Sequence, residues 1–230
     1  MKHHYLVFLS LLLLTFTACE KEDEELSTIS QGDYPVKEYY LERNPSVNPW
    51  GVGMDFIHEE CQLTSTDLDY LYLTTDTTNA YDILFYTVKA YYTDDNGDTQ
   101  SEGCPAMLLG ENVSAVQVGA GVDFFDSLTV VTEDMTSALR TEPTVDYEAC
   151  KVDGIYDRTL LFEALDQCVI GRSFRSNVLV VPEGQTEEEV QAVYLVYTSE
   201  GGYVKFMVKQ FKGDAPYEKQ TLVRWQVISE

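Results

Sequence analysis

The chain of 230 residues carries 39 Asp and Glu against 15 Lys and Arg, which gives it a formal net charge of −24. Nucleic acids and anionic lipid headgroups would repel so acidic a surface, so binding to either through charge is excluded. The length suits one all-β domain or two small ones. The 16 tyrosines and many β-branched residues favour strands over helices.

An apolar run near the N-terminus ends shortly before a cysteine. Residues 6–14 are apolar except for Ser10, and Phe16, Thr17 and Ala18 then lead to Cys19. A helix that spans a bilayer needs roughly 20 apolar residues, so this shorter run predicts a secretory signal peptide over residues 1–18. A cysteine at the cleavage point is typical of a lipoprotein. We therefore expect lipidation of Cys19 with diacylglycerol and palmitate; an ordinary secretory peptide with a chance cysteine is the alternative.

The segment after Cys19 is strongly acidic. Residues 20–25 read Glu-Lys-Glu-Asp-Glu-Glu, and no hydrophobic periodicity follows until about residue 33. We expect residues 19–33 to form a lipidated, disordered tether and residues 34–230 to fold as a single β-rich domain. The acidic tract resembles the surface-export signal of Bacteroidetes lipoproteins. The resemblance implies a lipid-anchored protein of the outer membrane that faces the extracellular side.

Four cysteines besides the lipidated one are candidates for disulfides: Cys61, Cys104, Cys150 and Cys168. An exported protein meets an oxidising compartment, where disulfides persist. Four cysteines allow three pairings, and the sequence does not choose among them. We favour two bridges, with buried thiols as the alternative. No Cys-x-x-Cys pair is present, so a structural zinc site is not expected.

Residues 82–92 give the clearest strand signal, because every even position from Leu84 to Tyr92 is apolar or aromatic. The strand ends at residues 94–98, Asp-Asp-Asn-Gly-Asp. Asn-Gly is a strong hairpin signal, since both residues tolerate positive φ. A calcium loop is the alternative interpretation of these five residues, although the full EF-hand pattern fails because Gly97 comes too early.

Other elements follow from alternation and turn residues. Weaker strands are predicted at residues 70–74, 113–118 and 128–132. Residues 159–168 fit either a short helix or a strand. Thr186 and Glu189 have the spacing of a capping box, which predicts a turn of helix, with an acidic loop as the alternative.

The last forty residues predict an antiparallel meander. Its strands are expected at residues 192–198, 203–211 and 222–228, with a glycine turn after the first and a break at residues 213–216. Trp225 and Val227 are expected in the core.

This meander resembles the C-terminal end of the HmuY-like haem-binding lipoproteins. The matching residues are 193–206 (VYLVYTSEGGYVKF), 209–213 (KQFKG) and 221–225 (TLVRW). Residues 80–85 (AYDILF) are similar to that family's Trp-Asp-apolar-Ala-Phe strand, with Tyr81 where tryptophan is usual. The lipidated signal peptide and the acidic tether fit the same family. The resemblance implies a mostly antiparallel β fold with one or two short helices.

The resemblance also implies a function: extracellular capture of haem or a related tetrapyrrole and its transfer to an outer-membrane receptor. Family members hold the haem iron between two histidines or use methionines. His58 is the one histidine after the signal peptide, so one chain cannot supply two. The candidate ligands are therefore Met107, Met207, Met135 and His58. Methionines are common core residues, and His58 is alternatively an exposed polar residue.

Met207 shares a strand face with Lys205 and Lys209, which could pair with haem propionates. A solvated face is the simpler interpretation of these lysines. Two tyrosine pairs, at residues 39–40 and 91–92, could stack on haem or sugar, or they belong to exposed strands.

Enzymatic motifs are missing from the sequence. One histidine gives no Ser-His-Asp set, and neither a Gly-x-Ser-x-Gly elbow nor a His-Glu-x-x-His motif is found. We therefore expect no enzyme and, beyond haem, no metal site. The alternative function is a surface lipoprotein of the same fold that binds glycan, peptide or a partner protein.

Overall fold

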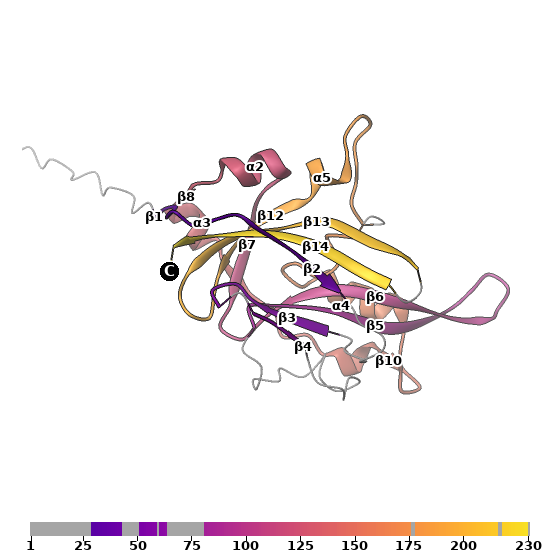
Figure 1. Cartoon of the computed structure of the whole chain (residues 1–230). Helices are drawn as coiled ribbons and strands as arrows, with labels where there is room; N and C mark the ends of the chain where they lie inside the picture. The colour runs from indigo at the N-terminus through magenta and orange to yellow at the C-terminus, as the bar shows by residue number, and fades with distance from the viewer. Residues whose placement is uncertain are drawn as a thin grey trace, which may run out of the picture.

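Figure 1 shows a computed structural model of the chain, which describes residues 29–42, 51–58, 60–63, 81–175, 178–215 and 218–229. The fold is mostly antiparallel β, as predicted. The signal peptide, Cys19 and the predicted strand at residues 70–74 lie outside the described residues. Within those residues, no helix has the length and apolar character to cross a bilayer.

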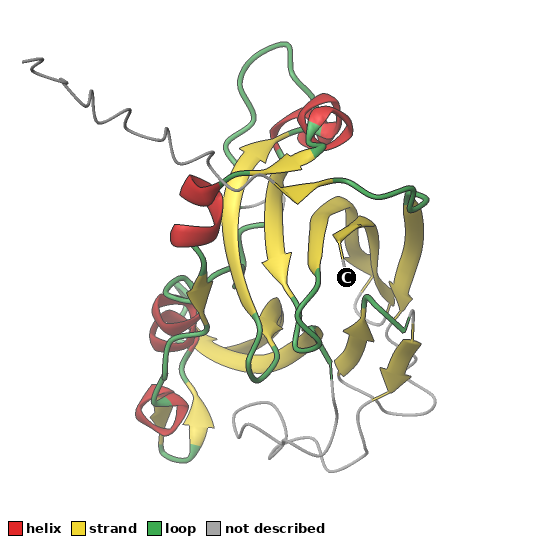
Figure 2. Cartoon of the chain, turned by 90° about the vertical axis from the view of Figure 1, so that its left-hand side faces the viewer, coloured by secondary structure: helices red, strands yellow, loops and turns green. Residues whose placement is uncertain are grey.

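Two antiparallel sheets are stacked on one another (Figures 1 and 2). The larger has the order β2-β14-β13-β12-β7-β9, and its strands are β2 (Lys37–Glu42), β14 (Glu218–Ser229), β13 (Tyr203–Ala215), β12 (Ala192–Tyr197), β7 (Ser114–Ala120) and β9 (Arg140–Thr141). The smaller has the order β4-β3-β5-β6, and its strands are β4 (Glu60–Leu63), β3 (Gly51–Asp55), β5 (Ile83–Thr93) and β6 (Thr99–Leu109).

Short elements cover the outer faces of the sheets. The described ones are β1 (Ile29–Ser30), α2 (Val122–Ser127), β8 (Val130–Val131), α3 (Glu133–Ser137), η1 (Tyr147–Cys150), β10 (Lys151–Val152), β11 (Ile155–Tyr156), α4 (Arg158–Leu165) and α5 (Glu187–Val190). Helix α2 packs on the larger sheet and α4 on the smaller, so the molecule has four layers.

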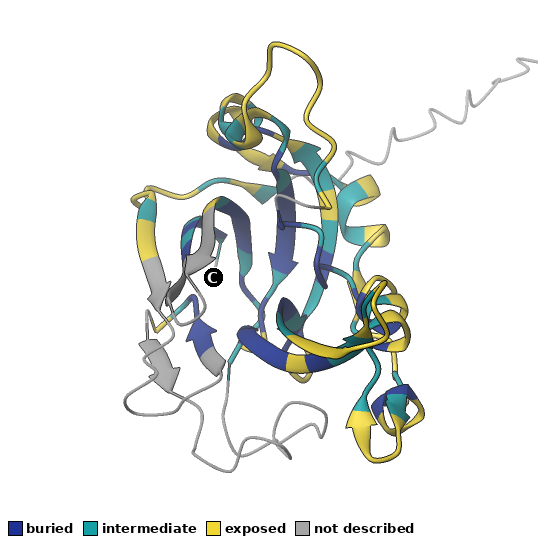
Figure 3. Ribbon diagram, turned by 90° about the vertical axis from the view of Figure 1, so that its right-hand side faces the viewer, coloured by how far each residue is buried: buried dark blue, intermediate teal, exposed yellow. Residues whose placement is uncertain are grey.

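The main core lies between the two sheets, where buried strands are concentrated in Figure 3. On β13, Val204, Phe206 and Val208 all face this core, as their alternation predicts. Trp225 on β14 is buried opposite Phe206, and Val227 packs at the edge of the same core. The meander is therefore confirmed, and its two longest strands carry much of the apolar contact.

Strand β5 is buried on both faces over its first half. Ile83 and Phe85 enter the main core, whereas Leu84, Tyr86 and Val88 pack beneath α4. The hairpin after β5 is also as predicted: Gly97 has φ of 86°, and the Asp94 carboxylate accepts the backbone N–H groups of two turn residues at 2.9 Å.

Three predicted elements have a different form in the structure. The sequence predicted that the strand from residue 203 would end before residue 213. This end was wrong, because β13 continues to Ala215 through an irregular register with β14. Residues 128–132 contain only the two-residue strand β8. Within the predicted tether, Ile29 and Ser30 are ordered as a strand that pairs with β8.

The two uncertain segments are both helical. Residues 159–168 contribute to α4, which begins after Asp157, whose side chain accepts from the Leu160 N–H at 3.0 Å. At α5 the Glu189 carboxylate accepts from Thr186 N at 2.6 Å, which confirms the reach back to the N-cap.

The predicted pair of disulfides is not formed. Cys104, Cys150 and Cys168 are buried thiols, and none of these three described cysteines is in a disulfide. Each sulfur has separate surroundings: Cys104 packs in the cluster under α4, Cys150 Sγ lies 3.6 Å from Leu160 O, and Cys168 Sγ lies 3.5 Å from Tyr147 Oη. Two bridges would need all four cysteines, so buried thiols are correct for these three. The side chain of Cys61 is outside the described residues.

The lysine face of β13 is not solvated, contrary to the simpler interpretation of the sequence. Lys205 is 1% exposed, and its Nζ donates to the Phe125 and Leu128 carbonyl oxygens, both at 2.8 Å. These carbonyls end α2, so the buried ammonium satisfies acceptors that the helix leaves unpaired. Lys209 lies further along β13 and forms an ion pair with Glu38 near the surface.

Replacing Lys205 with methionine tests this role. We expect Lys205→Met to lower the free energy of unfolding by about 1–3 kcal/mol, because two buried carbonyls lose their donor. The matched variant Lys209→Met removes only partly exposed ion pairs with Glu38 and Glu188 and should cost less than about 1 kcal/mol. Urea unfolding of both variants measures the difference, and equal losses would contradict a special role for Lys205.

Candidate functional site

Asp82 joins the two sheets at one end. Its Oδ2 accepts from Phe56 N at 2.9 Å, just beyond β3 of the smaller sheet. Its Oδ1 accepts from Ser199 N at 3.2 Å, in the turn between β12 and β13 of the larger sheet. Asp82 is 1% exposed, so these bonds are shielded from water. The carboxylate therefore fixes the turn after β3 against the turn after β12.

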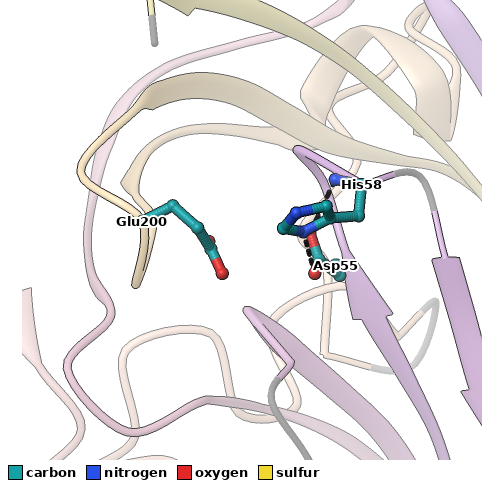
Figure 4. A group of neighbouring side chains, drawn as sticks. All are labelled: Asp55, His58 and Glu200. Carbon is teal, nitrogen blue, oxygen red and sulfur yellow. Dashed lines mark hydrogen bonds and ion pairs between the residues drawn. The ribbon is translucent and has the colours of Figure 1, made fainter.

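Those two turns bring Asp55, His58 and Glu200 together (Figure 4). Asp55 ends β3, and its Oδ1 accepts from the N–H groups of Ile57 at 3.0 Å and His58 at 2.9 Å. Its Oδ2 lies 2.8 Å from His58 Nδ1, which sets the direction of the imidazole. Glu200 reaches the same space from the β12–β13 turn. The possible ligand atoms of the three side chains lie within 4.8 Å of one another.

The site is rich in negative charge. Burial raises the pKa of Asp82 from 3.8 to about 6, the two backbone N–H bonds oppose the rise, and the nearby charges of Glu200 and Asp55 add to it. Above pH 6 the ionised Asp82 adds its negative charge to a site already lined by Asp55 and Glu200. A cation placed there would be stabilised by all of them.

The donor set suits a metal. Carboxylate oxygens and imidazole nitrogen are ligands of zinc and similar divalent ions. A carboxylate bonded to one imidazole nitrogen is also the usual partner of a histidine that ligates metal through the other. Among the described residues, Asp55, His58 and Glu200 are the one group with this geometry. The structure therefore offers a candidate metal-binding site at the end of the sheets.

The candidate ligands from the sequence lie in three places. His58 is at the rim, with its side chain 59% exposed. Met107 is fully buried in the main core, where its backbone pairs with Gly171. Met207 is fully buried beneath α2, and Met135 packs against the same small cluster. The structure thus brings Met135 and Met207 to one apolar cluster, away from the main core that holds Met107.

Asp55, Asp82 and Glu200 were not among the residues predicted for the site. The hydrogen bond between Ser199 N and Asp82 joins positions 117 residues apart, so no local spacing in the sequence could predict it. The one available signal was the Asp-x-x-His spacing of Asp55 and His58, which is the spacing of a side chain that closes its own turn.

The tyrosine pairs also have defined places. Tyr39 on the edge strand β2 is 47% exposed. Tyr92 lies beneath Arg158, whose Cζ is 4.1 Å from the ring centroid, and Tyr91 contacts Lys89 at 4.9 Å. These two rings are thus occupied by cationic neighbours.

No protein family model and no curated protein matches the sequence. Two solved structures align with most of the chain. One is a protein of Bacteroides vulgatus described as HmuY-like and haem-binding, with 10% identity, a TM-score of 0.39, and coverage of 82% of this chain and 90% of its own. The other is an apo HmuY analogue of Tannerella forsythia, with 8% identity, a TM-score of 0.36, and coverage of 86% and 100%. Both descriptions name the family that the C-terminal motifs resemble.

The buried Asp82 gives the stability a pH dependence. The folded protein holds this proton up to a pH of about 6, whereas the usual value is 3.8. Deprotonation is therefore harder in the folded state, and stability falls as the pH rises between these values. Relative to Asp82→Asn, we expect the wild type to lose roughly 3 kcal/mol between pH 4 and 7, at about 1.4 kcal/mol per pKa unit. Urea unfolding of both proteins across this range gives the difference, and a constant difference would contradict the burial of an ionisable Asp82.

Proposed function

We propose that this chain is a non-catalytic, lipid-anchored protein of the cell surface that captures haem or a related tetrapyrrole, with His58 as the ligand of the iron. The proposal rests on the surroundings of His58, which is the one histidine after the predicted signal peptide. Its side chain is exposed, and its ring is held by the Asp55 carboxylate at 2.8 Å. A carboxylate in this position orients an imidazole and makes it a better donor to a metal.

The choice of haem rests on the sequence. The C-terminal meander and the strand at residues 80–85 resemble a haem-binding family, and the expected lipid on Cys19 would keep the protein at the membrane that haem must cross. A receptor in the outer membrane would then accept the haem. A single imidazole gives one axial ligand, so the bound iron would differ spectrally from a bis-histidine centre.

A divalent cation is the second candidate ligand. Three donor side chains of the kind that zinc prefers converge within 4.8 Å, and the buried Asp82 adds negative charge beneath them. In this case Glu200 would be as necessary as His58, whereas haem ligation needs only the imidazole. This difference separates the two functions experimentally.

Titration of the mature protein with haem and with Zn²⁺ tests both candidates. For haem we expect a Soret shift that saturates at about one equivalent and at least a tenfold loss of affinity in His58→Ala. Glu200→Gln should leave haem affinity within about twofold. For Zn²⁺, measured by calorimetry, both variants should lose at least tenfold, because each removes one of three ligands.

Each result selects one outcome. Haem binding that survives His58→Ala would contradict the proposed ligand and direct attention to Met135 and Met207. Saturable zinc binding without a haem response would favour the cation. If neither ligand binds, the proposal fails and the same fold would serve glycan, peptide or protein recognition.

A further inference from the structure

Three arginines gather around one phenylalanine at the other end of the smaller sheet. The Cζ atoms of Arg172, Arg175 and Arg158 lie 3.7, 5.5 and 5.9 Å from the centroid of the Phe162 ring. We call these three residues the arginine cluster. With only 15 Lys and Arg against 39 acidic residues, a chance gathering of three arginines on one ring is unexpected.

The fold explains how the cluster is assembled. A bridge between Tyr91 and Asp157 holds the start of α4 against the end of β5, and Arg158 follows directly. Arg172 and Arg175 belong to one turn, since Arg175 N donates to the Arg172 carbonyl oxygen at 3.0 Å. The three guanidinium groups therefore come from two segments, the start of α4 and the turn at residues 172–175, and meet at Phe162 of α4.

Two of the three arginines have acidic partners. Arg172 donates to the Asp166 carboxylate through Nε at 2.8 Å and Nη2 at 2.6 Å, the two-point geometry that suits this pair. Arg158 Nη1 lies 3.8 Å from Glu102 Oε2. Among the described residues, one carboxylate pairs with Arg172 and one with Arg158, and none forms an ion pair with Arg175.

Arg175 is the arginine without a carboxylate. It is 9% exposed, and among the described residues its Nε and Nη1 have no hydrogen-bond acceptor. Burial lowers the pKa of Arg175, and the like charge of Arg172 adds to this effect, while the nearby charges of Glu102 and Asp166 oppose it. A buried guanidinium that lacks acceptors is costly, because both its charge and its N–H groups have lost water. An anion bound beside it would remove this cost.

We infer that the arginine cluster is a binding site for an oxyanion, either a carboxylate or a phosphate group. Guanidinium groups recognise both through directed N–H bonds. Arg158 is stacked on Tyr92 and Arg172 on Phe162. Because a guanidinium group also stacks on flat aromatic ligands, a carboxylate on an aromatic body would suit the cluster better than a small aliphatic acid. The exposed edge of the cluster is Arg158, whose side chain is 38% exposed.

This site is separate from the one at His58. The nine residue-to-residue steps of β5 from Ile83 to Tyr92 span about 30 Å at roughly 3.3 Å per step. Asp82 lies at one end of this strand and Arg158 contacts the other. The inference therefore goes beyond the proposed function and does not depend on it.

Calorimetric titration of the wild type with benzoate, acetate and inorganic phosphate tests the inference at constant ionic strength. We expect one saturable site, with benzoate binding at least fivefold more tightly than acetate if the natural ligand is an aromatic carboxylate. Tighter binding of phosphate would assign a phosphate group instead. Arg175→Gln should weaken the preferred anion at least tenfold, and circular dichroism would confirm that the variant is folded.

Two further variants keep the test decisive. Arg158→Gln removes the exposed edge without disturbing the buried guanidinium, and it should weaken binding severalfold even if Arg175→Gln fails to fold. Arg140→Gln, on the edge strand β9, removes one positive charge elsewhere and should have no effect. Absence of saturable binding, or equal binding in Arg158→Gln and Arg140→Gln, would overturn the inference.

Discussion

The carboxylate of Asp82 is the interaction on which the arrangement of the two sheets and the candidate site depends. It is buried and accepts one N–H from beyond β3 and another from the β12–β13 turn. An ionised group is expensive to bury, and here two charge-assisted hydrogen bonds, which no apolar side chain could replace, offset only part of that cost, since the pKa of Asp82 stays raised. The same bonds place His58 and Glu200 within reach of one another. A structural contact and a possible binding site are therefore built from one residue.

Buried positive charges in this acidic chain also need hydrogen-bond partners to offset the loss of water. Lys205 lies under α2 and satisfies two carbonyl groups, so its position has a structural explanation within the fold. Arg175 is also buried, but its Nε and Nη1 have no hydrogen-bond acceptor among the described residues. The contrast between them separates a cation that supports a helix end from one that has capacity for a ligand. Because the surface as a whole is negative, only a site with concentrated arginine can attract an anion.

Local patterns predicted the elements of the fold well. Alternation in residues 82–92 identified β5, Asn-Gly identified its hairpin, and Thr186 with Glu189 identified α5. Long-range relations were not accessible. Lys205 and Lys209 have the same position in the alternating pattern, yet one is buried because α2 covers it, and α2 is about eighty residues earlier in the chain. The prediction of two disulfides was wrong for the same reason. The separate positions of Cys104, Cys150 and Cys168 depend on the packing of the fold and cannot be predicted from their spacing in the sequence.

The site shows this limit most clearly. Sequence reasoning selected His58 because imidazole is a strong metal donor, but its partner Glu200 comes from a turn of the other sheet. Asp82 looked like the first residue of a strand, and its role follows from a hydrogen bond over 117 residues. A sequence shows which residues could donate to a metal. Which of them come close together depends on how the two sheets pack.

The most direct test of the account observes the imidazole of His58 itself. Protein produced from residue 19 onward has one histidine, so the ring ¹⁵N and ¹H signals of His58 form a single assigned set in an NMR spectrum of uniformly labelled protein. We expect one equivalent of haem to broaden or shift these ring signals strongly by direct ligation, while backbone signals of the distant α4 stay unchanged. Haem binding that leaves the ring signals of His58 unaltered would contradict the central claim.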